Sequence, residues 1–334
     1  MASSAGAPIS RDLIDNCTQA VFTPMALRAA LQLDVFTPLS NGPMTAKALS
    51  NALGVDVRRL EMLLYQLVVG KFLDIEDGRF ANTKVSDHYL VRGLPSYIGG
   101  IHELWTTQWN ALLQTAESIL TNVPQAKIDF ANMSEEELGG FLRGMHGNNL
   151  SAGRELARMD EFAGFQRIVD VGGGSGGLAI ALCEGHPHLL ATVIDLPAVV
   201  PITQKFVAEL GLEKRIEVKI ANVLEGPPPG DYDAAIARSF FQVLSEDQFK
   251  QAAQNIAVAL PTGGLFYVIG NICDDTRLSP ERTVAFNTVF INLYEDGQVY
   301  TESQYRDWLS SAGFVDISRE PFMLGASLMI ARKA

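Results

Sequence analysis

The chain has little cysteine and no excess of positive charge. Its 334 residues include three cysteines, Cys17, Cys183 and Cys273. They lie far apart and are odd in number, so they fit no metal-binding spacing, and we expect reduced thiols in the cytoplasm and no metal site. Lysine and arginine total 26 against 38 aspartates and glutamates, a formal net charge of -12. Nucleic acid and anionic membranes repel an acidic chain, so we expect neither as a partner.

Long apolar runs are also missing. No run reaches the ~18 residues of a membrane-spanning helix. The first residues, "MASSAGAPISRDLIDNC", lack the basic and apolar regions of a signal peptide, so we expect neither a membrane span nor a leader. The composition is 47% hydrophobic and 19% charged, as in globular proteins with a buried core. The length suits two domains of ~150 residues each.

The first domain, residues 1–160, is predicted to be mainly helical, and its helices precede a small hairpin at Asp77-Gly78. Helices followed by a hairpin resemble a winged helix, which either binds DNA or serves dimerisation. Residues 30–85 carry equal numbers of bases and acids: Lys47, Arg58, Arg59, Lys71, Arg79 and Lys84 against Asp34, Asp56, Glu61, Asp74, Glu76 and Asp77. A phosphate-binding face needs a basic excess, so dimerisation is favoured.

The second domain, residues 161–334, alternates two kinds of segment. Short apolar runs such as "RIVDV", "LATVIDL", "YDAAIA" and "GGLFYVIG" are typical of buried parallel strands. Amphipathic stretches between them, such as "SEDQFKQAAQNIAVAL", are typical of helices. This alternation predicts an α/β fold with a Rossmann-like, doubly wound sheet.

A glycine-rich turn follows the first strand of that sheet. In "IVDVGGGSGG", Gly172, Gly174 and Gly177 match G-x-G-x-x-G, and the next strand ends in Asp195. Glycine allows tight turning and close approach of a ligand. An acid at the end of the second strand can accept hydrogen bonds from ribose hydroxyls. The pattern therefore predicts a nucleotide-containing cofactor at the carboxyl ends of the strands.

Asp170 narrows the choice of cofactor. A pyrophosphate is anionic, and a carboxylate beside it is unfavourable. S-adenosylmethionine (SAM) carries an ammonium and a sulfonium instead, which an acid at the strand end suits. Asp170 therefore favours SAM over a dinucleotide, although the carboxylate could instead cap the local turn.

Three segments resemble a known family: "VDVGGGSG", "VIDLP" and "KIANVLEGPPPGDYDAAIARSFFQVLSEDQ". They resemble the class I SAM-dependent methyltransferases, and more narrowly the dimeric O-methyltransferases of plant phenolics and bacterial secondary metabolism. The resemblance spans essentially the whole chain. It implies a homodimer through a winged-helix-like domain, and O-methylation of a small molecule with S-adenosylhomocysteine as product. It also implies a set of cofactor contacts: Asp170, Gly172, Gly174, Asp195, Leu196, Asn222, Val223 and Arg238.

The sequence departs from the family pattern at four positions. Asn222 stands where the family has an acid that meets the adenine. Gln242, in "SFFQVL", stands in place of the catalytic histidine of the family. Gly270 and Val299 stand where the family has glutamates that support that histidine. The usual base machinery is therefore missing.

This loss leaves several chemistries open. A phenol needs a base, which typically contributes ~10²–10⁴-fold. Gln242 can orient a substrate oxygen but cannot accept a proton. Either another base is used, with His146 ahead of His102, or the acceptor needs no deprotonation, as in S-methylation of a thioether or transfer to nitrogen or carbon. Further alternatives are a SAM-binding enzyme that does not transfer methyl, an NAD enzyme and a winged-helix regulator.

Candidate substrate contacts lie in two helical segments and in a group of aromatic residues. Arg143 could bind a carboxylate bidentately, although it could also be a solvated charge, as could Arg154. Asn287 and Asn292 lie in an apolar helix where buried amides need partners, so we expect substrate contact from one of them. The remaining candidates for the pocket are Trp105, Trp109, Met145 and Phe241. Core packing is the alternative for nearby aromatic residues, Phe286, Phe290 and Tyr294.

Overall fold

The computed structural model describes residues 9–130 and 132–334, and the chain divides into two compact units between His102 and Glu103. The sequence analysis places this boundary at residue 160. The difference arises because α9 (Glu135–Leu156) packs closely on α10 (Gly177–Gly185) of the sheet-containing unit. A Cβ atom at Gly153 of α9 would lie 2.5 Å from the Leu178 carbonyl oxygen, so only glycine permits this approach. The helices after residue 102 therefore belong with the sheet.

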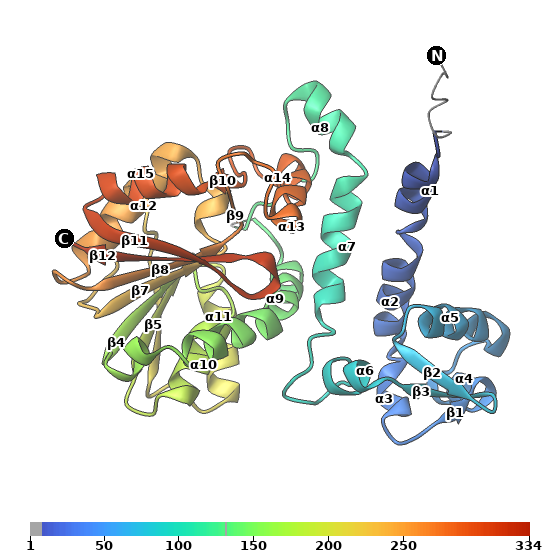
Figure 1. The fold of residues 1–334 in the computed structure, drawn as a ribbon. Helices are drawn as coiled ribbons and strands as arrows, with labels where there is room; N and C mark the ends of the chain where they lie inside the picture. The colour runs from blue at the N-terminus through green and yellow to red at the C-terminus, as the bar shows by residue number, and fades with distance from the viewer. Residues whose placement is uncertain (1–8, 131) are drawn as a thin grey trace, which may run out of the picture. The chain divides into compact units, whose positions relative to one another are not determined.

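The N-terminal unit combines helices with a small antiparallel sheet of order β1-β3-β2 (Figure 1). Thr45 caps α4 by accepting a hydrogen bond from the Ala48 N–H at 3.2 Å, which positions this helix after β1. Asp77 and Gly78 both have positive φ and turn β2 into β3, so the predicted hairpin is confirmed. The elements are α1 (Asp12–Gln19), α2 (Phe22–Leu33), α3 (Phe36–Leu39), β1 (Met44–Thr45), α4 (Ala46–Leu53), α5 (Val57–Val69), β2 (Leu73–Glu76), β3 (Arg79–Asn82) and α6 (Lys84–Tyr89).

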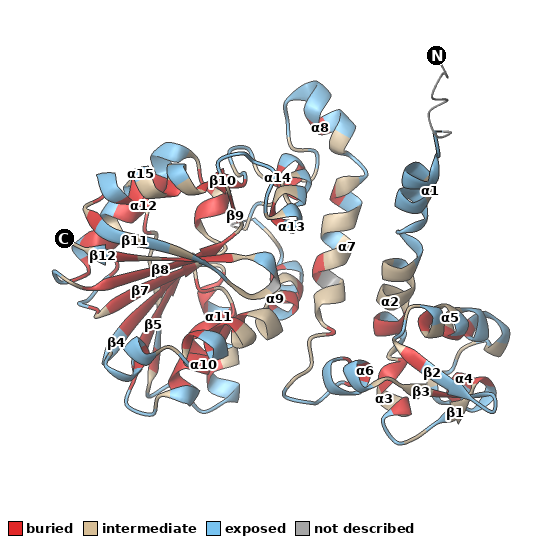
Figure 2. Ribbon diagram, viewed as in Figure 1, coloured by how far each residue is buried: buried red, intermediate tan, exposed pale blue. Residues whose placement is uncertain are grey.

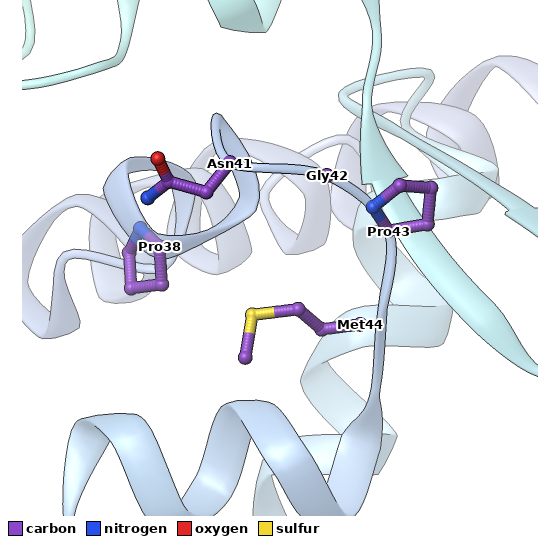
Figure 3. A pocket seen from close by; sticks show the side chains of 5 residues that line it. All are labelled: Pro38, Asn41, Gly42, Pro43 and Met44. Carbon is purple, nitrogen blue, oxygen red and sulfur yellow. The ribbon is translucent and has the colours of Figure 1, made fainter.

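The N-terminal unit exposes apolar side chains as well as burying them. Leu64 and Leu67 of α5 are fully buried, whereas none of the residues of α1 is buried (Figure 2). The large apolar side chains left in solvent include Leu13, Ile14, Phe22, Met62, Tyr65 and Val69. An open hollow of about 520 Å³ lies after α3 (Figure 3). Its lining residues, Pro38, Asn41, Gly42, Pro43 and Met44, include no titratable side chain, so we assign it no chemistry.

The second unit contains a seven-stranded sheet of order β11-β12-β8-β7-β4-β5-β6. The strands from β6 to β8 in this order are parallel, and β12 and β11 are antiparallel to their neighbours. The predicted doubly wound α/β sheet is therefore confirmed. The strands are β4 (Arg167–Val171), β5 (Leu190–Asp195), β6 (Ile216–Ile220), β7 (Ala234–Arg238), β8 (Leu265–Gly270), β11 (Phe314–Pro321) and β12 (Ser327–Lys333).

Helices cover both faces of this sheet (Figure 1). On one face, α12 and α15 bury Phe249 and Leu309 against strand residues such as Val169. On the other face, α9, α10 and α11 bury side chains such as Leu182 against strand residues such as Ile168. Because both faces are covered, the carboxyl ends of the strands are where this fold leaves room for a ligand. The helices are α7 (Ile101–Leu112), α8 (Thr115–Thr121), α9, α10, α11 (Val200–Glu209), α12 (Glu246–Val258), α13 (Glu281–Ala285), α14 (Asn287–Leu293) and α15 (Glu302–Ser311), with a short parallel pair of strands, β9 (Ile272–Cys273) and β10 (Tyr300–Thr301).

Candidate functional site

The glycine turn between β4 and α10 leaves no room for side chains. Gly172, Gly174 and Gly176 have φ values of +64°, +58° and +69°, a region that other residues rarely adopt. A Cβ atom at Gly172 would lie 2.8 Å from the Phe240 ring. One at Gly173 would lie 2.7 Å from Oδ2 of Asp170. The turn is therefore a backbone surface that a ligand can approach closely.

Asp195, at the end of β5, is fixed by the same turn. Its Oδ2 accepts the Gly174 N–H and its Oδ1 accepts the Leu196 N–H, both at 2.8 Å. Burial raises the pKa of this carboxyl group, and the two N–H donors oppose that rise. Each carboxylate oxygen keeps a lone pair for a further donor. Asp195 can therefore accept hydrogen bonds from two ribose hydroxyls without moving.

Asp170 is buried, and its carboxyl group lacks some of the hydrogen bonds that would offset the cost of burial. Only 1% of its surface is exposed, and its Oδ2 has no hydrogen-bond partner among the described residues. Burial, reinforced by the nearby charge of Asp195, raises the pKa of Asp170 to about 7, and the charge of Arg238 opposes the rise. A buried carboxylate without a partner is costly, which points to a cationic ligand group here.

Arg238, at the end of β7, is the opposite charge at this site. Its Nη1 donates to Oδ1 of Asn149 on α9, while its Nε is buried and has no partner among the described residues. Burial lowers the pKa of Arg238 to about 10, so it stays charged at neutral pH. Asp170 and Arg238 together suit a ligand that carries both an ammonium and a carboxylate, as the amino-acid end of SAM does. Sequence reasoning missed Asn149 because a polar helix residue looks like solvent-exposed surface.

His146 lies beside the glycine turn. Its Nδ1 is 2.9 Å from Oγ of Ser175, and its ring stacks on Phe206 with centroids 4.5 Å apart. Burial, with a smaller effect of Arg154, lowers the pKa of His146 to about 4. The imidazole is therefore neutral at physiological pH, and one of its nitrogens is engaged by the turn.

Gln242 lies next to Gly270 and to the residue before Val299, three positions at which the sequence analysis expects departures from the family pattern. Gln242 is buried, and its Oε1 accepts the Asn271 N–H at 2.8 Å. A Cβ atom at Gly270 would lie 3.1 Å from that oxygen, so a glutamate at 270 would crowd it. The main-chain oxygen of Gln242 accepts the N–H of Gln298, next to Val299. The substitutions at 242 and 270 therefore fit each other, and the amide supports the backbone.

Asn222 and Val223, predicted to meet the adenine, are held in the turn after β6. Oδ1 of Asn222 accepts the Leu224 N–H at 3.1 Å, and its Nδ2 donates to Glu225 at 2.9 Å. The Val223 side chain is buried in the core. The Asn222 amide closes its own turn, so its contact with adenine stays a prediction.

Three predicted substrate residues make contacts within the protein. Asn292 is fully buried, and its amide bonds Thr115, Ser118 and the Thr288 carbonyl, which pins α14 to α8. Asn287 accepts the Val299 N–H at 2.8 Å. Phe241 is 1% exposed and packs in the core, 4.2 Å from the Phe249 ring centroid. The protein itself satisfies the two amides and packs the Phe241 ring, and a substrate contact from any of the three stays a prediction.

The other substrate candidates stay predictions. Trp105 is half-buried and stacks on Trp109 with centroids 5.4 Å apart. Arg143 is exposed on α9 and Met145 is half-buried. The described residues contain no group of three or more His, Cys, Asp or Glu side chains that could hold a metal ion. They also contain no helix long and apolar enough to cross a membrane.

Comparisons with known proteins agree with this geometry. An O-methyltransferase domain model matches residues 122–315, and an O-methyltransferase dimerisation domain model matches residues 16–92. The chain is 30% identical over 312 residues to 3-hydroxy-5-methyl-1-naphthoate 3-O-methyltransferase of Streptomyces sahachiroi, covering 91% of this chain and 90% of the relative. It is 26% identical over 330 residues to N,N-dimethyltransferase OxyT of Streptomyces rimosus, covering 95% and 94%. Its fold matches human N-acetylserotonin methyltransferase in complex with SAM, with a TM-score of 0.85 at 22% identity over 100% of both chains.

Proposed function

The chain belongs to the O-methyltransferase family and is a SAM-dependent methyltransferase, and we propose that its acceptor is an acidic hydroxyl group on a small aromatic molecule. The naphthoate hydroxyl in the name of the Streptomyces sahachiroi relative supports this acceptor class. The observation that carries the acidic character is the buried Gln242 amide, which holds the Asn271 N–H in place of a proton-accepting side chain.

The residues of this chain hold and orient the reactants. SAM supplies a methyl group that its sulfonium already activates. Asp195 would accept the ribose hydroxyls, while Asp170 and Arg238 would hold the amino-acid end. Because these charges are buried, their interactions with a ligand are stronger than in water. Positioning and exclusion of water are the contributions that the chain makes to the transfer.

Because no proton-accepting side chain is assigned, the acceptor itself must supply a reactive lone pair. A phenol like that of tyrosine has a pKa of about 10 and is mostly protonated at neutral pH. An aromatic hydroxyl acidified by a conjugated carbonyl substituent ionises closer to neutrality and needs no protein base. Gln242 cannot remove a proton, and burial lowers the pKa of His146 to about 4, which makes its imidazole a weak base. An anionic phenolate therefore suits this chain better than an ordinary phenol.

The test is a pH series with aromatic hydroxyls of graded acidity, with the methylated product measured by mass spectrometry. We expect kcat/KM to rise with pH to a plateau whose midpoint follows the pKa of each acceptor. A midpoint that stays fixed for all acceptors would reveal a base in the protein. If no hydroxyl is methylated while SAM binds, the acceptor assignment fails.

A second acceptor class is favoured by the same missing base. A thioether or a neutral amine already has an available lone pair, and OxyT is named as a methyltransferase acting at nitrogen. For a thioether, the rate at saturating SAM would stay flat between about pH 6.5 and 9, because a thioether has no proton to lose. The same assay therefore separates the two classes. A protein that binds SAM without transferring methyl would give no methylated product from any acceptor.

We also propose that the enzyme is a cytoplasmic homodimer. The match to a dimerisation domain supports association through residues 16–92. The exposed apolar side chains of α1, α2 and α5, among them Leu13, Phe22 and Met62, are the surface that such an interface would bury. The free thiols of Cys183 and Cys273 fit a reducing compartment. Light scattering on the purified chain tests the dimer, and a monomeric mass at micromolar concentration would contradict it.

A further inference from the structure

We propose that His146 is a positioning residue that fixes the glycine turn for the cofactor, and that it does not accept a proton in the reaction. The proposal rests on the SAM-dependent activity and not on the identity of the acceptor. His146 was the leading alternative base in the sequence, so the proposal removes a protein base from the reaction and assigns the residue a different role.

The turn that His146 contacts needs external support. Ser175 is fully buried and lies between two glycines with positive φ, Gly174 and Gly176. Glycines restrict the backbone little, so such a turn has low intrinsic stiffness. Thr203 of α11 bonds the Gly174 carbonyl, and Asp195 of β5 bonds its N–H. The Ser175 hydroxyl is hydrogen-bonded to His146 of α9.

The imidazole is itself held in a fixed orientation. Its ring lies nearly parallel to Phe206, with an interplanar angle of 20°. Next to the turn, a Cβ atom at Gly177 would lie 3.1 Å from Nδ1 of His146 and 3.0 Å from Cβ of Asn149, so a side chain there would crowd this contact. His146 thereby joins α9, the glycine turn and α11, three elements that surround the cofactor residues.

The charges around His146 oppose a role as a base. Burial lowers its pKa to about 4, with a smaller effect from Arg154 on the same helix. The partners from the other two elements, Ser175 and Phe206, are uncharged. Taking up a proton would place a charge in this buried setting, which disfavours the charged form. A neutral imidazole that bonds Ser175 is the stable state.

A set of variants separates the positioning role from catalysis. His146→Phe keeps the stacking on Phe206 and loses the bond to Ser175, Ser175→Ala removes the other partner, and His146→Asn places a polar atom near the position of Nδ1. Ser151→Ala, on the same helix with its hydroxyl bonded to the Gly147 carbonyl, is the matched control. Calorimetry with S-adenosylhomocysteine measures cofactor affinity, and steady-state kinetics separates the KM for SAM from kcat.

We expect His146→Phe and Ser175→Ala each to raise the Kd about five- to tenfold, the cost of one hydrogen bond. The double variant should be no weaker than either single variant, because both remove one contact. His146→Asn should recover most of the affinity, and Ser151→Ala should bind like the wild type. The KM for SAM should rise with the Kd, while kcat at saturating SAM stays within about threefold and keeps its pH profile.

Two results would overturn the proposal. An unchanged Kd in both His146→Phe and Ser175→Ala would mean that the bond does not position the turn. A loss of kcat of ~10²-fold or more at saturating SAM, restored by raising the pH, would identify His146 as a base. If His146→Phe does not fold, the affinities of Ser175→Ala and His146→Asn decide the first point, and the pH profile of His146→Asn decides the second. Because binding is measured without an acceptor, failure of the proposed acceptor class leaves the affinity results intact.

Discussion

Two regions at the carboxyl ends of the strands differ in how their buried polar groups are satisfied. At the ends of β4 and β7, Asp170 is buried and Arg238 is half-buried, and each has a buried side-chain atom without a partner among the described residues. In the turn after β7, Gln242 is buried and neutral, and its Oε1 accepts the N–H of Asn271, the residue after β8. Unpartnered buried charges indicate a ligand, whereas a satisfied amide indicates scaffold. We therefore propose that the first region recognises the cofactor, whereas the Gln242 amide supports the backbone beside it.

The largest effect should come from removing the carboxylate that bridges the glycine turn. Asp195→Ala deletes the acceptor of the Gly174 and Leu196 N–H groups and the predicted ribose contacts. We expect the Kd for S-adenosylhomocysteine to rise roughly tenfold or more, because charge-assisted hydrogen bonds contribute ~1.5–3 kcal/mol. Calorimetry measures this change, with Asp195→Asn as the control that keeps one acceptor oxygen. Unchanged affinity in Asp195→Ala would remove the ribose assignment.

The second region should respond in stability and not in chemistry. Gln242→Ala leaves the Asn271 N–H without its acceptor, which should cost ~1–3 kcal/mol of unfolding free energy. Gln242→Glu keeps an acceptor oxygen and serves as the control. At saturating substrates kcat should fall less than about tenfold, well below the ~10²–10⁴-fold effect of a lost base. Denaturant unfolding and steady-state kinetics measure the two quantities. A large loss of kcat without a loss of stability would place Gln242 among the catalytic residues.

A pH series tests how the burial of Asp170 affects the stability of the folded protein. Burial raises the pKa of the folded carboxyl from 3.8 to about 7, so its stabilising contribution is full below about pH 4 and is lost as pH rises through about 7. The isosteric variant Asp170→Asn does not titrate. In cofactor-free protein, the Tm of Asp170→Asn minus the Tm of the wild type should rise as the pH increases from about 4 to about 7, by about 2–4 °C for each kcal/mol that the wild type loses. Differential scanning calorimetry measures this difference, and a difference that stays constant or falls over this range contradicts the burial argument.

The smallest effect is expected at the adenine turn. Asn222→Asp keeps the oxygen that accepts the Leu224 N–H and replaces the donor to Glu225 by a like charge. Because this pair lies near the surface, stability should fall by less than about 1 kcal/mol. Affinity for S-adenosylhomocysteine should stay within about threefold. A tenfold gain in affinity would instead show that restoring the acid restores an adenine contact.

The sequence predicts the cofactor region better than the rest of the site. The positive φ of Gly172 and Gly174 and the place of Asp195 follow from one local strand-turn-helix pattern, so they are visible in the chain. Asn149 and the domain boundary depend on how α9 packs, which no local pattern encodes.

Asn292 and Phe241 show the second limit of the sequence. A polar or aromatic residue in an apolar segment looks the same whether it meets a substrate or another helix. Only packing reveals that Asn292 bonds Ser118 and Thr115 of α8 and that Phe241 packs against Phe249.

One binding comparison tests the central claim most directly, namely that Asp170 and Arg238 recognise the amino-acid end of the cofactor. S-adenosylhomocysteine has this end, whereas 5′-methylthioadenosine shares the adenosine and the thioether but lacks it. Calorimetry should show S-adenosylhomocysteine binding at least ~100-fold tighter, the effect of two charge-assisted contacts at ~1.5–3 kcal/mol each. Arg238→Met and Asp170→Asn should each reduce this ratio. Equal affinity for the two ligands in the wild-type protein would contradict the account.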